Sequence, residues 1–106
     1  MPGDVEMAVL TAAFTARSDH AGDLAAVLAR YVVLTRGEAE CRNVDLLVSA
    51  TQSDRFLVIE KWDSVEAARA HLDTPLMTEM AAAAVPLLAE KPTIDLLDPI
   101  SAQDLE

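Results

Sequence analysis

The chain has little cysteine, no long apolar run and no basic N-terminal segment. Its 106 residues include one cysteine, Cys41, which cannot form an internal disulfide or supply a zinc site built on several thiolates. The longest apolar runs fall well short of the roughly 20 residues that cross a membrane. The first ten residues carry Asp4 and Glu6 where a secretory signal carries basic residues. These absences predict a cytoplasmic protein that does not enter the membrane.

Basic residues are also scarce. Eight Lys and Arg stand against 18 Asp and Glu, which gives a formal net charge of −10 at pH 7. Such a surface repels nucleic acid and anionic lipid, so the expected partners are neutral or cationic small molecules, or protein. Hydrophobic residues make up 52% of the chain, which is enough for a packed core. Length and composition predict one domain over residues 1–106, with a core from about 5 to 100 and an acidic tail at 101–106.

Strand and helix patterns follow one another in the order strand, helix, strand, strand, helices, strand. This order predicts an α+β fold of the ferredoxin-like, split βαβ type, with a four-stranded antiparallel sheet and helices on one face. The predicted strands cover residues 5–14, 41–50, 55–62 and 93–97. The first helix is predicted to begin after the capping residues Ser18, Asp19 and His20 and to end at Gly37.

Two shorter helices are predicted between the third and fourth strands. Ser64 is a good N-cap for the first of them, and Thr74 is a good N-cap for the second. Pro75 follows Thr74 at the first helical position, where its missing N–H costs nothing. Pro86 is predicted to kink or end the second helix.

The far face of the predicted sheet has no helix to cover it. Neither alternate set of residues in 5–14 or 55–62 is polar throughout, so the uncovered face is expected to be nearly as apolar as the covered one. A large exposed apolar face marks an interface. The pattern therefore predicts a homodimer in which two sheets pack face to face.

Three short motifs resemble the antibiotic biosynthesis monooxygenase family. They are Glu60-Lys61-Trp62 at the end of a strand, Ala70-His71-Leu72-x-Thr74-Pro75 on the next helix, and the passage from Arg36 to Cys41, which resembles the family's Arg-x-Glu-Pro-Gly-Cys with Ala39 and Glu40 in place of Pro-Gly. The resemblance implies a dimeric α+β barrel. It also implies oxidation of a phenol or hydroquinone by O₂ without metal, flavin or haem. The haem-degrading branch needs a histidine that residues 76–90 do not contain.

The resemblance assigns the catalytic positions to Trp62 and His71. An indole can pack on an aromatic ring and donate its N–H to a ligand oxygen, and a histidine can take up a proton at neutral pH. Both residues can equally be packing residues of the core. Five further residues are expected to contact substrate: Asn43, Phe56, Val58, Met77 and Met80.

Two other polar residues have structural interpretations. Glu60 shares strand parity with Trp62, and Arg42, Arg55 or Lys61 is expected to pair its charge. Tyr31 falls on the apolar stripe of the first helix and is interpreted as a core residue.

Three functions remain open at this point. The first is a cofactor-independent monooxygenase acting on a small aromatic substrate with O₂. The second is a dimer of the same fold that binds a small molecule without catalysis. The third is an isomerase or lyase of the dimeric barrel group that uses His71 for proton transfer. No Gly-rich phosphate loop, metal-spaced His/Asp/Glu set or Ser/His/Asp order points elsewhere.

Overall fold

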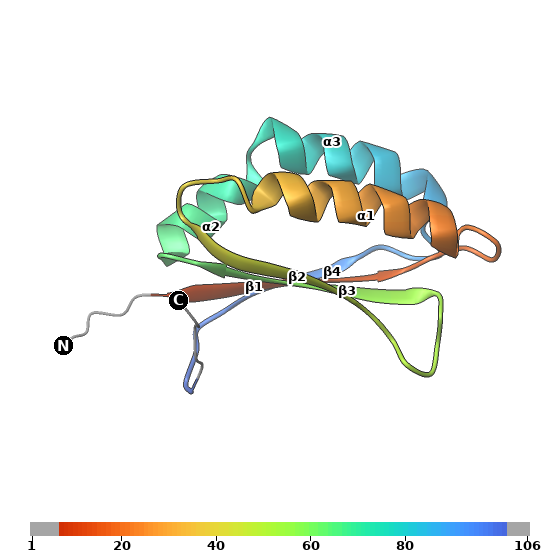
Figure 1. Ribbon diagram of the computed structural model, residues 1–106, viewed down its shortest axis with the longest axis horizontal. Coiled ribbons are helices and arrows are strands. Elements are labelled where there is room, and N and C mark those ends of the chain that lie inside the picture. Colours follow the sequence, from red (N-terminus) through yellow and green to blue (C-terminus); the bar gives the residue numbers. More distant parts are fainter. Residues whose placement is uncertain (1–6, 102–106) are drawn as a thin grey trace.

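A computed structural model describes residues 7–101 and arranges them as a four-stranded sheet with three helices (Figure 1). The sheet order is β2-β3-β1-β4, and all neighbouring strands are antiparallel. This is the predicted ferredoxin-like α+β fold. The elements are β1 (Ala8–Thr15), α1 (Ala21–Thr35), β2 (Cys41–Val48), β3 (Arg55–Trp62), α2 (Val65–Leu72), α3 (Pro75–Ala84), a 3₁₀ turn (Val85–Leu87) and β4 (Thr93–Leu97). The predicted start of the first strand at Val5 and the acidic tail beyond Ser101 lie outside the described residues.

The helices all lie on one face of the sheet (Figure 1). In β1 and β3 every second residue is buried, because successive side chains of a strand point to opposite faces. The buried set of β3 is Phe56, Val58, Glu60 and Trp62. Glu60 is thus a carboxylate on the helix-covered face, between two apolar neighbours of the same parity.

The predicted caps of α2 and α3 are confirmed. The Ser64 hydroxyl accepts from the Ala67 N–H at 3.0 Å, and the Thr74 hydroxyl accepts from the Met77 N–H at 3.3 Å. Pro75 is the first residue of α3. The α-helix ends at Ala84, and the chain continues as the 3₁₀ turn that contains Pro86. The Ser64 cap fixes where α2 begins after β3, and the Thr74 cap fixes where α3 begins after α2. Together they set the position of the last turn of α2.

The predicted capping of α1 by a side chain is wrong. His20 occupies the N-cap position and makes no side-chain capping hydrogen bond. Asp19 has φ 69°, in the left-handed region, and the tight turn is closed by the backbone bond from the His20 N–H to the Arg17 carbonyl at 3.0 Å. At its other end α1 stops at Thr35, just before the predicted Gly37.

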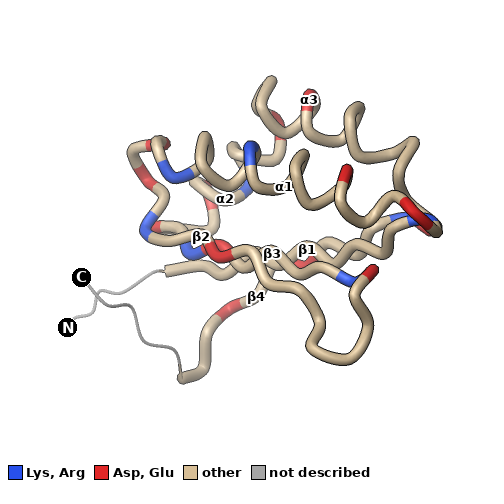
Figure 2. The backbone as a smooth tube through the Cα atoms, turned by 45° about the vertical axis from the view of Figure 1, so that its right-hand side comes forward, with Lys and Arg blue, Asp and Glu red and all other residues tan. Residues whose placement is uncertain are grey.

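The uncovered face of the sheet is more polar than the sequence analysis predicts. Leu47 and Leu97 are 46% and 44% exposed, and Leu57 and Ile59 have the same strand parity as Lys61, opposite to buried Glu60. Lys61 interrupts these apolar side chains on β3, and acidic positions occur on the outer strands β2 and β4 as well as on the helices (Figure 2). In the described part of the chain, no helix has the length and apolar character needed to cross a membrane.

Candidate active site

The structure brings Trp62 and His71 together at one end of the sheet. Trp62 is the last residue of β3, His71 lies in the last turn of α2, and Asp63 and Ser64 join the two elements. The ring centroids are 4.6 Å apart with an interplanar angle of 32°. Each residue is 1% exposed. The strand-to-helix connection therefore places an imidazole against an indole with little access to water.

Glu60 is held by groups from three different elements. Its Oε1 accepts from the Trp62 Nε1–H at 2.9 Å, and its Oε2 accepts from the Tyr31 hydroxyl at 2.6 Å. His71 Nε2 lies 3.6 Å from Oε1. Glu60 is only 2% exposed, so these partners replace water around a buried charge.

The expected pairing of Glu60 with a basic side chain of the hairpin is replaced by this arrangement. Strand alternation turns Arg55 and Lys61 to the face opposite Glu60. The Arg42 Nε donates to the Asp63 carboxylate at 2.7 Å. The partners of Glu60 are Trp62 of the same strand and Tyr31 and His71 of the helices, because these lie on the face toward which Glu60 points.

Tyr31 connects Glu60 to His71. Its hydroxyl lies 2.6 Å from His71 Nε2 as well as 2.6 Å from Glu60 Oε2. Burial raises the pKa of Tyr31 far above its usual value, and the nearby Glu60 carboxylate raises it further, so the phenol stays protonated and can donate. Tyr31 is buried as predicted, but its hydrogen-bonding role was missed. The available signal was a phenol on the apolar stripe of α1, because a buried tyrosine hydroxyl usually finds a partner.

Glu38 completes the set on the side nearer solvent. Its carboxylate oxygens lie 3.1 and 3.3 Å from His71 Nδ1, and its side chain is 29% exposed. Glu38 belongs to the turn between α1 and β2 and was not among the predicted site residues. We call these five residues the histidine network: Glu38, His71, Tyr31, Glu60 and Trp62.

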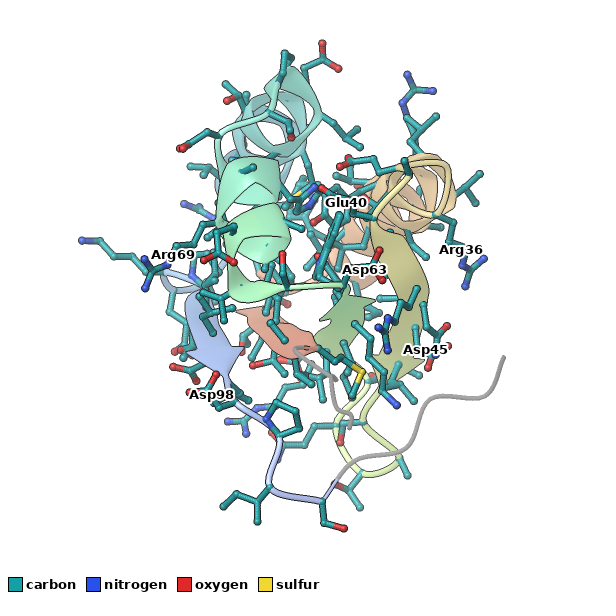
Figure 3. The ribbon with its side chains drawn as sticks, turned by 90° about the vertical axis from the view of Figure 1, so that its left-hand side faces the viewer. Arg36, Glu40, Asp45, Asp63, Arg69 and Asp98 are labelled. Atoms are coloured by element: carbon teal, nitrogen blue, oxygen red, sulfur yellow. The ribbon has the colours of Figure 1, made fainter. Side chains whose placement is uncertain are left out.

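A cleft of about 400 Å³ opens beside the histidine network. Its volume falls within the range of pockets that bind small molecules. Two acidic residues of the turn, Glu38 and Glu40, line it, and Figure 3 views this end of the molecule with Glu40 between α2 and α1. The remaining lining residues are Ala39, Trp62, Ala67, Ala70, His71 and Thr74. Three of the lining residues are alanines, whose small side chains take up little of the cleft.

Comparison with known proteins decides the family. A family model described as antibiotic biosynthesis monooxygenase matches residues 7–83. The chain belongs to this family. It is similar to the structure of Rv0793 from Mycobacterium tuberculosis, with 27% identity over 92% of this chain and 98% of that one, and a TM-score of 0.84. It is also similar to PA3566 from Pseudomonas aeruginosa, with 29% identity over 93% and 100% of the two chains and a TM-score of 0.82.

A third solved structure, protein SO0527 from Shewanella oneidensis, shares the fold at 24% identity, with a TM-score of 0.82 over 91% of this chain and 93% of that one. A search of curated proteins found no significant match. Membership of the monooxygenase family thus rests on the family model, and the substrate has to be inferred from the site.

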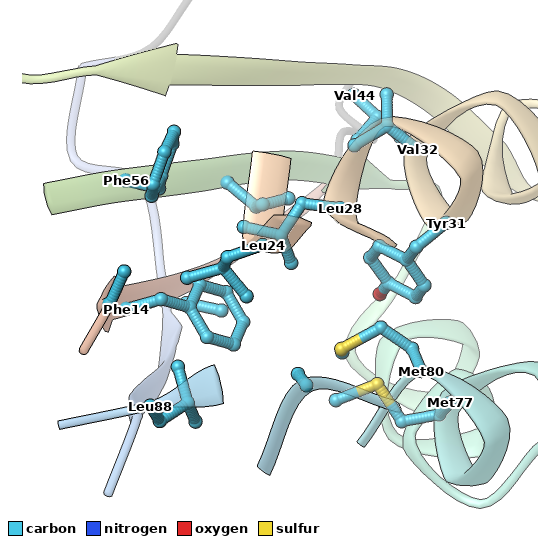
Figure 4. Packing of buried hydrophobic residues seen from close by; sticks show 14 residues of the cluster. Phe14, Leu24, Leu28, Tyr31, Val32, Val44, Phe56, Met77, Met80 and Leu88 are labelled. Atoms are coloured by element: carbon cyan, nitrogen blue, oxygen red, sulfur yellow. The ribbon is translucent and has the colours of Figure 1, made fainter. Parts of the chain in front are cut away.

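Four of the residues predicted to contact substrate belong to the core. Phe56, Val58, Met77 and Met80 are at most 9% exposed and pack in the main apolar cluster between helices and sheet. Figure 4 shows three of them there, with Met77 and Met80 of α3 near Tyr31. None of the four lines the cleft beside His71.

Asn43 also lies away from this cleft, and a β-bulge explains why. Cys41 pairs with Trp62, but Asn43 pairs with Lys61, so the strand register shifts between Cys41 and Asn43. The extra residue reverses the parity of β2 and turns Asn43 toward the uncovered face, where its amide lies 3.5 Å from Asp45. Without the bulge, Asn43 would share the face of Cys41 and Trp62.

The acidic residues and histidines of the described chain do not form a metal site. Across residues 7–101, no group of three or more His, Cys, Asp or Glu side chains is arranged to hold a metal ion. The acidic and imidazole groups of the histidine network are instead bonded to one another.

Cys41 is expected to react slowly with thiol reagents. Burial raises the pKa of its thiol to about 11, and the neighbouring Glu60 and Glu38 carboxylates add to the shift. At pH 8 the thiolate fraction is then roughly 200-fold below that of a free cysteine, and labelling should accelerate about tenfold per pH unit up to pH 10. The measurement is the rate of labelling of native protein, with urea-unfolded protein as the control. Labelling of both forms at one rate would contradict the assignment.

Proposed function

We propose that the chain is a cofactor-independent monooxygenase that oxidises a small phenol or hydroquinone with O₂ in the cleft beside Trp62 and His71. The observation that carries the proposal is a buried imidazole at the wall of a cleft, hydrogen-bonded to Glu38 and to the Tyr31 hydroxyl, which in turn donates to Glu60. Such a network can receive a proton from a bound phenol. Family membership supports the same reaction class.

The reaction begins with loss of the phenolic proton to the Glu38–His71 pair. The electron-rich phenolate passes one electron to O₂, giving a phenoxyl radical and superoxide. These combine to form a carbon–oxygen bond, and the new hydroperoxide takes up one proton. The O–O bond then breaks as the ring carbon loses its hydrogen, which leaves a quinone carbonyl and releases water. A phenol and O₂ thus yield a quinone and water, and each product receives one of the two atoms of O₂.

The remaining residues of the cleft bind and shield the substrate. The Trp62 N–H is occupied by Glu60, so the indole offers the substrate its ring rather than a hydrogen bond. Ala67 and Ala70 line the cleft beside the ring and add little bulk to it. Partial enclosure of the radical pair limits its escape into water.

Oxygen uptake with a panel of phenols and hydroquinones tests this function. Glu38 and Glu40 place two carboxylates at the cleft, so a substrate with its own carboxylate should be disfavoured. We expect kcat/KM for 2,5-dihydroxyphenylacetate to be about tenfold below that for the neutral 2,5-dihydroxyphenylacetamide, with the gap narrowing at high salt. Equal values would contradict this selectivity. Product formation without O₂ would favour an isomerase or lyase, and binding without turnover would favour the non-catalytic dimer.

We further propose that two copies pair through the uncovered face of the sheet. Leu47, Leu57, Ile59 and Leu97 supply apolar area on this face, and polar residues between them can bond across the interface. Light scattering at micromolar concentration should give twice the mass of the chain. Ile59→Asp, which places a charge at the centre of this face, should give the mass of one chain. A wild-type monomer at the same concentration would rule the pairing out.

A further inference from the structure

The histidine network is linked by successive contacts between neighbouring side chains. Three contacts follow one another: Glu38 to His71 Nδ1 at 3.1 Å, His71 Nε2 to Tyr31 at 2.6 Å, and Tyr31 to Glu60 at 2.6 Å. Each needs one hydrogen between its two atoms. The Tyr31 hydroxyl supplies the one that points to Glu60. These contacts run in an unbroken chain from Glu38, on the turn before β2, to Glu60 of β3.

The buried members of the network have no atom left for a substrate. Both nitrogens of His71 are engaged, Nδ1 with Glu38 and Nε2 with Tyr31. Both oxygens of Glu60 accept hydrogen bonds, and Glu60 is 2% exposed. The Trp62 N–H and the Tyr31 hydroxyl are the donors in those bonds. A phenol in the cleft cannot hand its proton to His71 without first displacing an existing partner.

Glu38 differs from the others because it reaches both the network and the cleft. Its side chain is 29% exposed and lines the cleft. A carboxylate has about four lone-pair sites, and the single N–H of His71 uses only part of them. The backbone fixes its place on the turn, since the Glu38 N–H donates to the Thr35 carbonyl at 3.0 Å and the Glu38 carbonyl accepts from the Cys41 N–H at 3.1 Å.

We propose that Glu38 is the catalytic base of the reaction and that His71 acts behind it as a positioning residue. The inference rests on the proposed function. The phenolic O–H bond breaks, an O–H bond forms on a Glu38 oxygen, and the electron pair stays on the phenolate. The hydrogen bond from His71 Nδ1 orients the Glu38 carboxylate, while Tyr31 and Glu60 hold the imidazole in place. When the hydroperoxide forms, Glu38 returns the proton to it.

The test is oxygen uptake by Glu38→Gln and Glu38→Ala. Each should lower kcat by at least about 100-fold, because a positioned base contributes about 10²–10⁴-fold. Added acetate should restore part of the rate of Glu38→Ala, since a small carboxylate can enter the open side of the cleft. Glu66→Gln is the matched control. It removes one negative charge from the exposed first turn of α2 and should keep the wild-type rate.

The outcomes distinguish a wrong role for Glu38 from a wrong proposed function. If the wild-type protein took up no oxygen with any phenol, both the proposed function and the role of Glu38 would be overturned. An active wild type with Glu38→Gln within threefold of it would overturn only the role of Glu38. Loss of activity in Glu38→Ala without acetate rescue, in a protein with an unchanged circular dichroism spectrum, would also count against Glu38 as the base.

Discussion

Replacing Glu60 with alanine is expected to lower the free energy of unfolding by about 3–5 kcal/mol, the range seen when one partner of a buried charge pair is removed. The substitution leaves the Trp62 N–H and the Tyr31 hydroxyl without their acceptor, and it removes the negative charge beside His71. All three groups are buried, so water does not replace the lost bonds. Urea denaturation followed by the fluorescence of the single tryptophan, Trp62, measures the change.

Two further variants make the result specific to the network. Glu60→Gln keeps the shape of the side chain, and its amide can accept from Trp62 and donate to the Tyr31 oxygen, so it should cost less than the alanine variant. Glu66→Ala removes an exposed carboxylate and should change stability by about 1 kcal/mol at most. A loss of less than 1 kcal/mol for Glu60→Ala would mean that Glu60 is not paired as described.

Local sequence signals were enough to predict the order of the elements. The caps at Ser64 and Thr74, with Pro75 behind the second, act through bonds between residues three apart, which a linear sequence displays directly. Strand parity likewise placed Glu60 on the same face as Trp62. These two signals bring Trp62 and His71 to one end of the sheet without any knowledge of distant contacts.

The rest of the site depends on long-range packing and on a register shift. The apolar stripe of α1 shows that Tyr31 faces the sheet, but not which residue of β3 lies beneath it. That depends on how the helix crosses the strands. Glu38 meets His71 across 33 positions of sequence for the same reason. The bulge after Cys41 left no sequence signal, and it turns Asn43 to the face of the sheet opposite Trp62.

The second large effect is expected at His71. His71→Asn removes the ring that orients Glu38 and packs on Trp62, and turnover with the best phenol of the panel should fall by at least about tenfold. KM should change less than kcat, because the indole and the alanines that line the cleft remain. Oxygen uptake measured at saturating phenol gives kcat, and the full dependence of the rate on phenol concentration gives KM.

The other histidine of the chain supplies the control for this variant. His20 lies at the start of α1, with a side chain 45% exposed and 3.3 Å from Asp23, far along the sequence from the cleft residues. His20→Asn should therefore keep wild-type turnover. This result would show that the loss in His71→Asn depends on where the histidine lies and not on the loss of any histidine. Tyr31→Phe keeps the aromatic ring but removes the hydroxyl that holds His71 Nε2, and its rate should fall between those of wild type and His71→Asn. Equal oxygen uptake by His71→Asn and wild type would remove His71 from the mechanism, because neither orientation of Glu38 nor proton transfer could then depend on the imidazole.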